Sequence, residues 1–487
     1  MLLPLISLVI ILLFAFRSST WIYPAKKLPP GPPGLPLIGN LFQLLGVQRR
    51  GKPAIVIGSH KVALDLFEKR GSIYSERPRC IVANEIMTRN LVFAFAPHDN
   101  SWRRMRRASH EILNNQIVKN YHKFQNIEAV LLVKDLSKAP EFYIRHIQRA
   151  TTSSLLSVIY GLPPCPDPFD PTLMLVTDLT QSVLDAAAPG QHLVEYFPFL
   201  RYLPSRLCSW KRHAEHVFQI ADSVFGDLYR QVEKRAERAW LAGTLYAAGS
   251  ETTSKQMLWF LLSMAIYPDI QAKAQKQIDD IIGRERLPNL DDFERLPYVR
   301  ALIKELLRWR GVGPFGIPHA LSEDDYYEGY LIPKGTDCIV NVWALNHDQD
   351  VYGSDADFFR PERHLDQDGQ LKLVASRETK DEGHNTFGFG RRDIEKRVSR
   401  ICVGRHVAVN SLFIQMTCIL WCFNITPAED ETGKPIFIDE NEMIEDGLTV
   451  RPLPINRYKF TQRFPEMEEL VMNVLELDGR DHLDTED

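Results

Sequence analysis

A long, nearly apolar segment at residues 240–265, WLAGTLYAAGSETTSKQMLWFLLSMA, limits the folds open to this chain most strongly. A helix that is apolar on all sides is typical of the core of a large domain. Residues 403–423 are predicted to form a second buried helix, and the spacing of apolar residues is mostly helical from about 102 to 310. Short β-rich stretches, among them CIVNVWAL, are expected between about 312 and 345. The sequence therefore predicts one large domain, mainly α with a small β part.

The same helix carries candidate chemistry. Ala248 and Thr252 are four residues apart and share one face, and Thr252 can donate a hydrogen bond to the carbonyl of residue 248. Gly249 is predicted to let a flat ligand lie against the backbone. Glu251 is a carboxylate in an apolar setting, where such groups often handle protons. A core helix with a polar kink explains this segment equally well when it is taken alone.

Composition excludes several classes of protein. The 487 residues are 45% hydrophobic and 25% charged, which rules out disordered, collagen-like and coiled-coil chains. With 58 basic and 62 acidic residues the net charge is −4, so a general nucleic-acid binder is not expected. Seven cysteines without a C-x-x-C pair fit a reducing compartment and leave room for one cysteine with a special task. The sequence contains no glycine-rich phosphate loop, so no nucleotide or flavin domain is expected.

The N-terminal residues predict a transmembrane anchor at 1–23, followed by a proline-rich hinge at 24–40. As a helix, residues 2–23 would span about 33 Å, close to the hydrocarbon thickness of a bilayer. Basic residues follow the apolar run and none precedes it, which places the body of the protein, residues 41–487, in the cytosol. A cleaved signal peptide is the alternative, but the basic start and the small-residue cleavage site that it needs are missing.

Two further groups of residues suggest charge and metal chemistry. Glu305 and Arg308 share a helix face, and Arg363 in the loop FFRPERHLD can join them in a buried network; a surface ion pair is the alternative. Cys402 lies in a glycine-rich loop directly before the helix expected at 403–423, where backbone N–H groups favour its thiolate. A thiolate in such a setting can ligate a haem iron, whereas an inert buried thiol is the alternative.

Together these motifs resemble the cytochrome P450 family, and they occur in the family's order over nearly the whole chain. They are the anchor and hinge, W-x-x-x-R at 102–106, A-G-x-E-T-T at 248–253, E-x-x-R at 305–308, P-E-R at 361–363 and the cysteine loop. The stretches GTLYAAGSETT, FGFGRR and ICVGRH are most similar to fungal secondary-metabolism members, the group that includes O-methylsterigmatocystin oxidoreductase.

The resemblance implies a role for each matching residue. Cys402 would be the axial thiolate of haem b, iron protoporphyrin IX, and Thr252 with Glu251 would order water and deliver protons. Glu305, Arg308 and Arg363 match the family's structural triad behind the haem. Further haem contacts would come from Trp102, Arg106, His319, Phe387 and Arg400.

The cysteine loop departs from the family's pattern. The family places a glycine four residues before the cysteine, whereas Gly390 is twelve residues before Cys402. Residues 393–400, DIEKRVSR, are interpreted as an insert, and removing them restores FGFGRRICVG. Either Arg392 or Arg400 can fill the arginine position of the pattern, and direct spacing favours Arg400.

The leading prediction is a haem-thiolate monooxygenase, single-pass in the endoplasmic reticulum membrane with its body facing the cytosol. It would insert one oxygen atom of O2 into a lipophilic small molecule in fungal secondary metabolism. Electrons would come from NADPH through an external flavoprotein reductase. The alternative is an inactive or haem-deficient form, because of the insert and because segments of the family are interpreted as missing near 46–52 and 232–240. A membrane receptor or transporter is not expected, since one spanning segment is visible.

Overall fold

The computed structural model describes residues 53–188, 190–230, 236–372, 382–390, 400–453 and 457–483, together with Pro29 and Thr379. The predicted anchor at 1–23, all of the hinge except Pro29, the region near 46–52 and residues 393–399 of the insert lie outside this part. Within it, no helix is both long enough and apolar enough to cross a membrane.

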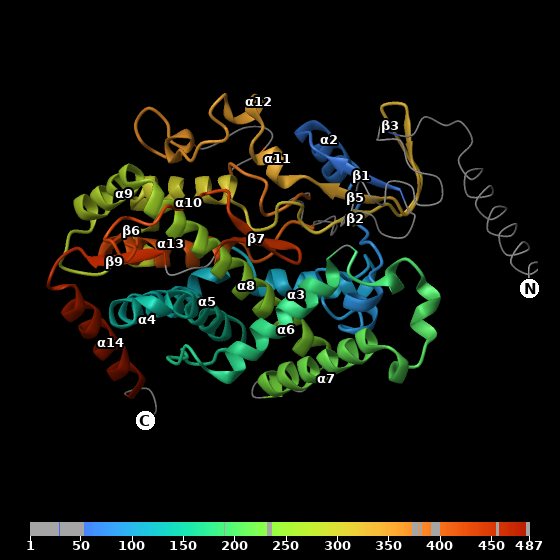
Figure 1. Cartoon of the computed structure of the whole chain (residues 1–487), viewed down its shortest axis with the longest axis horizontal. Helices are drawn as coiled ribbons and strands as arrows, with labels where there is room; N and C mark the ends of the chain where they lie inside the picture. The colour runs from blue at the N-terminus through green and yellow to red at the C-terminus, as the bar shows by residue number, and fades with distance from the viewer. Residues whose placement is uncertain are drawn as a thin grey trace, which may run out of the picture.

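Helices make up most of the fold, as the sequence predicts (Figure 1). The longer helices are α3 (Asn100–Leu113), α4 (His122–Lys138), α5 (Tyr143–Tyr160), α6 (Pro171–Ala187), α7 (Ser209–Arg230), α8 (Ala236–Ile266), α9 (Pro268–Ile281), α10 (Pro297–Trp309), α13 (Arg405–Cys422) and α14 (Met467–Leu483). Shorter helices are α2 (His60–Leu64), α11 (Val342–Asn346) and α12 (Gln349–Tyr352). Single turns of 3-10 or π type are η1 (Asp65–Lys69), η2 (Ile81–Ile86), η3 (Ile117–Tyr121), η4 (Pro140–Phe142), η5 (Leu193–Glu195), η6 (Pro198–Tyr202), η7 (Ser205–Leu207), η8 (Leu290–Arg295) and η9 (Pro361–His364).

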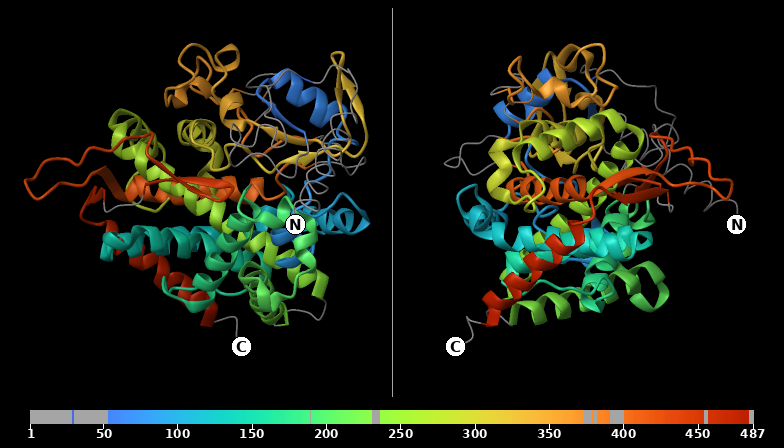
Figure 2. Two further views of the ribbon diagram at one scale, coloured as in Figure 1. Left: turned by 45° about the vertical axis from the view of Figure 1, so that its right-hand side comes forward. Right: turned by 90° about the vertical axis from the view of Figure 1, so that its left-hand side faces the viewer.

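The β part is small, and its main sheet has three strands in the order β1–β5–β2. In it, β1 (Ala54–Ile57) pairs in parallel with β5 (Asp337–Val340), and β2 (His319–Ala320) pairs antiparallel with β5. The two-stranded sheets are β3 (Asp325–Tyr327) with β4 (Tyr330–Ile332), β6 (Phe423–Pro427) with β9 (Tyr458–Gln462), and β7 (Met443–Asp446) with β8 (Thr449–Pro452). In the left view of Figure 2 the main sheet and α2 lie above the cyan and green helices.

The sequence located the main sheet better than the remaining strands. Strands β2, β4 and β5 lie in the region expected to be β-rich, but the VWAL part of CIVNVWAL begins α11. The side chain of Asn341 caps that helix by accepting from the N–H of Ala344 at 3.0 Å. The strands at 423–462 were not predicted, because each has only four or five residues, and β6 pairs with the distant β9.

Helix α8 connects two hydrophobic cores. Its C-terminal half, with Trp259 and Phe260, packs with α10 and α13, while its N-terminal half, with Trp240 and Tyr246, packs with α5, α6 and α7. All four of these aromatic side chains are fully buried. The prediction of two buried helices at 240–265 and 403–423 is therefore confirmed by α8 and α13.

Local signals explain where several helices begin and end. Helix α3 follows Asp99, whose carboxylate accepts the backbone N–H of Trp102 at 2.8 Å. Helix α6 follows Asp170, which accepts the N–H groups of Thr172 and Leu173. Helix α5 ends at Gly161, whose φ of +68° suits glycine. Of these helices, α3 carries the candidate residues Trp102 and Arg106.

Gly249 has a packing role that the sequence did not predict. A Cβ atom at this position would lie 2.8 Å from Cδ1 of Leu155, which belongs to α5. The missing side chain therefore permits a close approach of α5 to α8. The expectation that a flat ligand lies against this backbone stays a prediction, since the neighbouring Ala248 is exposed and Gly249 is half-buried.

Candidate functional site

Cys402 lies in the turn that leads into α13. Its backbone N–H donates to the carbonyl of Phe387 at 2.9 Å. Gly388 has a φ of +81°, a left-handed value that favours glycine, and its N–H donates to the carbonyl of Asn385 at 2.9 Å. The fold thus joins the backbone of Phe387 to that of Cys402, although residues 391–399 between them lie outside the described part.

The thiol of Cys402 is accessible although protein surrounds it. The side chain is exposed, yet desolvation by the surrounding protein raises its pKa, and the Gly404 N–H and the Arg106 and Arg405 cations oppose that rise only in part. A side chain with both properties faces a space that the polypeptide does not fill. The sequence predicted that the helix start favours a thiolate, and the backbone N–H groups of Gly404 and Arg405 do lower the pKa of Cys402. Burial is the larger effect, so the net pKa of the thiol is raised. A bound metal cation reverses the balance, since it deprotonates a coordinating thiol.

The exposed face of α8 is the second part of the site. Ala248 and Thr252 are exposed, whereas Ser250 and Thr253 on the same helix are buried. The hydroxyl of Thr252 donates to the carbonyl of Ala248 at 2.8 Å, as the sequence predicts. Because most of α8 around them is buried, Ala248 and Thr252 face a space inside the fold that side chains do not fill. Helix α13, which Cys402 precedes, packs directly against α8.

Glu251 lies beside Thr252 in the sequence but has different neighbours. Its carboxylate is buried and lies 2.8 Å from Nζ of Lys255, one turn along α8. Lys255 also donates to the hydroxyl of Thr449 at 2.7 Å and lies 3.4 Å from a carboxylate oxygen of Asp446. The carboxylate is therefore held toward the β7–β8 turn, while Thr252 faces the unfilled space.

A group of cations lies between Cys402 and the main sheet. Arg400 is placed over the ring of Trp102, with its guanidinium carbon 4.2 Å from the ring centre. It donates to the carbonyls of Ser75 at 3.1 Å and Ala96 at 3.0 Å. Burial lowers the pKa of Arg400 to about 9 and that of Arg106 to about 10. Of the two alternatives for the arginine position of the loop, Arg400 is the one described, because Arg392 lies outside the described residues.

His319 and Arg77 complete this group. His319 is held by a hydrogen bond of 2.7 Å between its Nδ1 and the carbonyl of Tyr74, and burial lowers its pKa well below the usual value. Arg77 donates to the carbonyls of Ile317 at 2.6 Å and Pro318 at 2.8 Å, just before His319. Sequence reasoning missed Arg77. Its signal, an arginine in S-E-R-P-R, does not distinguish a buried guanidinium from an exposed one.

Glu305, Arg308 and Arg363 meet in a buried ion network, where the sequence expected them to meet. Arg308 donates to both carboxylate oxygens of Glu305 at 2.8 Å, and Nε of Arg363 donates to one of them at 2.9 Å. His364, which the sequence analysis did not single out, lies 3.0 Å from the other oxygen. Burial alone would raise the pKa of Glu305, but these donors outweigh it and hold the pKa well below its usual range.

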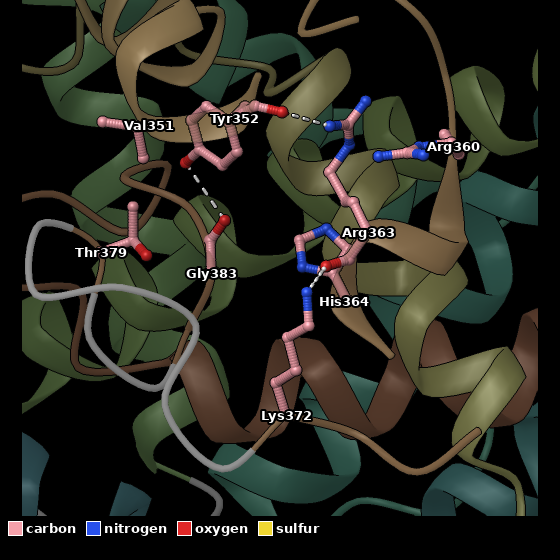
Figure 3. Close-up of a pocket in the computed structure, with 8 residues that line it drawn as sticks. All are labelled: Val351, Tyr352, Arg360, Arg363, His364, Lys372, Thr379 and Gly383. Atoms are coloured by element: carbon pink, nitrogen blue, oxygen red, sulfur yellow. Dashed lines mark hydrogen bonds between the residues drawn. The ribbon is translucent and has the colours of Figure 1, made fainter. Parts of the chain in front are cut away.

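The network reaches a cavity of about 160 Å³ beside α12, and Figure 3 shows its lining. The Arg363 guanidinium donates to the carbonyl of Tyr352 at 2.8 Å, and the Tyr352 hydroxyl donates to the carbonyl of Gly383 at 3.1 Å. Lys372 donates to the carbonyl of Arg363 at 2.8 Å. The segment that precedes the cysteine loop is therefore tied to the ion network through Gly383.

The donor set around Cys402 fits a haem. No ion pair of Arg106 or Arg400 with a carboxylate is found among the described residues. Burial lowers the pKa of both, although the charges of Glu76 and Asp99 oppose this in part for Arg400. Two atoms in the group, Nε1 of Trp102 and Nη1 of Arg400, are buried without a hydrogen-bond partner in the described part. Buried donors without acceptors are costly to the fold, and the two propionates of a haem are the acceptors that such a group requires.

Comparisons with known proteins agree with this geometry. The cytochrome P450 family profile matches residues 43–242 and 239–456. A cytochrome P450 monooxygenase of Armillaria gallica is 43% identical over 98% of both chains. Cytochrome P450 monooxygenase 58 of Postia placenta is 38% identical over 90% of both chains. Cytochrome P450 monooxygenase iboC of Amanita muscaria is 34% identical over 93% of this chain and 94% of its own.

The family implies a haem cofactor, and the accessible thiol and the cation group around Cys402 are residues that fit it. The chain belongs to the cytochrome P450 family and is a monooxygenase of that family.

Proposed function

We propose that this monooxygenase is a membrane-anchored haem-thiolate enzyme that oxidises a lipophilic small molecule in fungal secondary metabolism. Its electrons come from NADPH through a separate flavoprotein reductase. The observation that carries the proposal is the Cys402 side chain, which is exposed within crowded protein directly ahead of α13. The fungal relatives named cytochrome P450 monooxygenase support the reaction class.

In this proposal the residues divide into a haem-holding group and a proton path. Cys402 would ligate the iron of a bound haem, and Trp102, Arg106, His319 and Arg400 would hold its carboxylates. When bound, the haem supplies the activation of O2, and the thiolate ligand favours O–O cleavage. Burial keeps His319 neutral, so it can act as a hydrogen-bond partner without adding charge.

The proton path runs along the accessible face of α8. The Thr252 hydroxyl donates a hydrogen bond to the carbonyl of Ala248, so the lone pairs of its oxygen are free to accept a hydrogen bond from water. Glu251 is the adjacent carboxylate, and Nζ of Lys255 lies 2.8 Å from it. Proton delivery then requires Glu251 to exchange its contact with Lys255 for a water near Thr252.

Membrane association is supported by an apolar surface as well as by the sequence of residues 1–23. Six large apolar side chains are exposed between α6 and α7: Leu193, Phe197, Phe199, Tyr202, Leu203 and Leu207. Aromatic and aliphatic side chains exposed together in this way suit the interface of a bilayer. We place the body of the enzyme on the cytosolic side of the endoplasmic reticulum membrane.

An inactive or haem-deficient form remains the second proposal. It is favoured by the charged residues of 393–400 directly before Cys402, because geometry at a metal tolerates little displacement. The comparison with the Armillaria gallica relative extends over 520 aligned positions, more than the 487 residues of this chain. The relative therefore contains residues without a counterpart here, which supports the interpretation that segments are missing.

Haem content and turnover distinguish the two proposals. The full chain, produced with a fungal reductase, is expected to bind one haem and to consume NADPH in a way that depends on the reductase. Cys402→Ser should abolish consumption. Deletion of residues 393–400, which leaves Arg392 in the arginine position, should raise haem content and turnover if the insert is the defect. A full chain that remains without haem while the deletion variant acquires it would contradict the leading proposal.

A further inference from the structure

The connection between α6 and α7, together with the first turn of α7, is strongly basic. Between Glu195 and Glu215 the chain contains no acidic residue, and its charged side chains are Arg201, Arg206, Lys211 and Arg212. The same connection carries the six exposed apolar residues named above, which we call the apolar surface. In Figure 1 this green segment lies at the right-hand edge of the molecule. Basic residues alternating with exposed aromatic and aliphatic residues suit contact with anionic lipids.

A pocket of about 230 Å³ lies between this connection, η2 and the start of α7. Its lining contains three cations, two carboxylates and an aromatic ring: Arg89, Arg201, Lys211, Glu85, Glu215 and Phe218. Arg201 stands between Leu200 and Tyr202 in the sequence, so one wall of the pocket belongs to the segment that carries the apolar surface. The pocket and the apolar surface are therefore continuous along the chain.

The carboxylates of the pocket already have partners. Glu85 forms ion pairs with Arg79 and with Arg201, the second at 2.8 Å. Glu215 accepts a hydrogen bond from the Ser205 hydroxyl at 2.8 Å. Glu85 is thus neutralised by two guanidinium groups, one of which does not line the pocket.

Two of the three cations lack an acidic partner among the described residues. Nζ of Lys211 donates to the carbonyls of Arg201 at 2.8 Å and Leu203 at 3.1 Å. The Arg89 guanidinium lies over the ring of Phe218, 3.9 Å from its centre. Both side chains keep donors that can reach a ligand, since an ammonium has three and a guanidinium five.

The backbone holds Arg89 in an uncommon conformation. Its φ is +46° and that of Asn90 is +60°, values that residues other than glycine rarely adopt. Asn84 fixes this turn, because its amide donates to the side chain of Asn90 at 2.8 Å and its carbonyl accepts the Asn90 N–H at 2.7 Å. A strained residue held by its surroundings is often part of a functional site, and here the strain places the guanidinium over Phe218.

We propose that this pocket binds the phosphate of an anionic phospholipid, whose acyl chains lie along the apolar surface. The inference rests on the membrane association proposed above and names the lipid class that this surface selects. Arginine pairs with phosphate oxygens through two parallel hydrogen bonds, and lysine adds a compact charge. The adjoining apolar surface is the reason for assigning a lipid and not a soluble phosphate.

Native mass spectrometry of the full-length protein in neutral detergent micelles tests the site without depending on catalysis. Phosphatidylserine, phosphatidylcholine and inorganic phosphate are titrated separately against the wild type and Arg89→Gln/Lys211→Gln. The matched control is Arg206→Gln/Arg212→Gln, which removes two charges from the same segment outside the pocket. Since residues 1–23 are the same in every variant, differences between variants report on the pocket. Circular dichroism of each variant, and binding by the single variant Lys211→Gln, show whether a loss of lipid binding comes from misfolding.

We expect the wild type and the control to bind phosphatidylserine at least tenfold more tightly than the pocket variant. They should also prefer phosphatidylserine to phosphatidylcholine at least tenfold, and inorganic phosphate should bind far more weakly. Equal affinity of all variants, equal binding of the two lipids, or binding of inorganic phosphate as tight as that of the lipid would each overturn the proposal. Failure of the full chain to float with neutral vesicles would instead contradict the membrane association itself.

Discussion

Replacing Glu305 by glutamine isolates the charge at the centre of the ion network. The side chain keeps its size, but it loses its negative charge, and an NH2 group that donates hydrogen bonds replaces one of the two oxygen atoms. Arg308 and Arg363 are then left buried, with exposures of 1% and 9%, and the carboxylate that both of them contact is gone. Removing one partner from a buried ion pair costs about 3–5 kcal/mol. We expect Glu305→Gln to lower the free energy of unfolding by that amount.

Glu294→Gln is the matched control. Glu294 also pairs with an arginine, Arg300, but its side chain is 77% exposed. An exposed pair contributes about 0–1 kcal/mol. Urea unfolding followed by circular dichroism should separate the two variants by at least 2 kcal/mol. Equal midpoints and slopes for both variants would refute the argument that the buried carboxylate holds this region together.

Three further outcomes follow from glycine packing, a buried histidine and a helix cap. Gly243→Ala should destabilise the fold by about 1–3 kcal/mol, because the added Cβ would lie 2.4 Å from the ring of Phe225. Gly249→Ala should cost less, since the methyl groups of Leu155 can rotate away. Equal melting temperatures of the two variants would contradict this. Burial lowers the pKa of His347 to about 4, so this side chain binds a proton less readily in the folded state than in the unfolded state. Below about pH 6.5, His347 should therefore lower the free energy of unfolding by about 1.4 kcal/mol per pH unit. A pH profile that His347→Gln leaves unchanged would refute that assignment. Asp99→Ala should cost about 1 kcal/mol through the lost cap of α3, and Asp99→Asn should restore most of it in the same unfolding assay.

Short-range patterns in the sequence predicted the helices that carry the site. Segments 240–265 and 403–423 were recognisable because they are apolar over their full length, and the Thr252 hydrogen bond follows from a spacing of four residues. The meeting of Glu305 with Arg308 follows from helical spacing in the same way. The contact of Glu305 with Arg363, 58 residues further along the chain, was first considered for the loop FFRPERHLD and was then expected from the motif order of the family. Helical spacing does not predict it.

Properties that depend on tertiary packing could not be predicted in this way. The role of Gly249 depends on which helix faces it, and the sequence does not state that Leu155 lies there. The pKa of Cys402 depends on the balance between burial and the start of α13, and only the packed structure shows that burial is the larger effect. Arg77 was missed because its partners are backbone carbonyls of a segment 240 residues away.

The central claim is that Cys402 ligates a haem iron, and the absorption spectrum of the reduced full-length protein with carbon monoxide tests it most directly. Thiolate ligation gives a strongly red-shifted Soret band, which we predict for the wild type and which Cys402→Ser should lose. A spectrum of histidine-ligated or free haem in the wild type, or the same spectrum in both proteins, would contradict the claim.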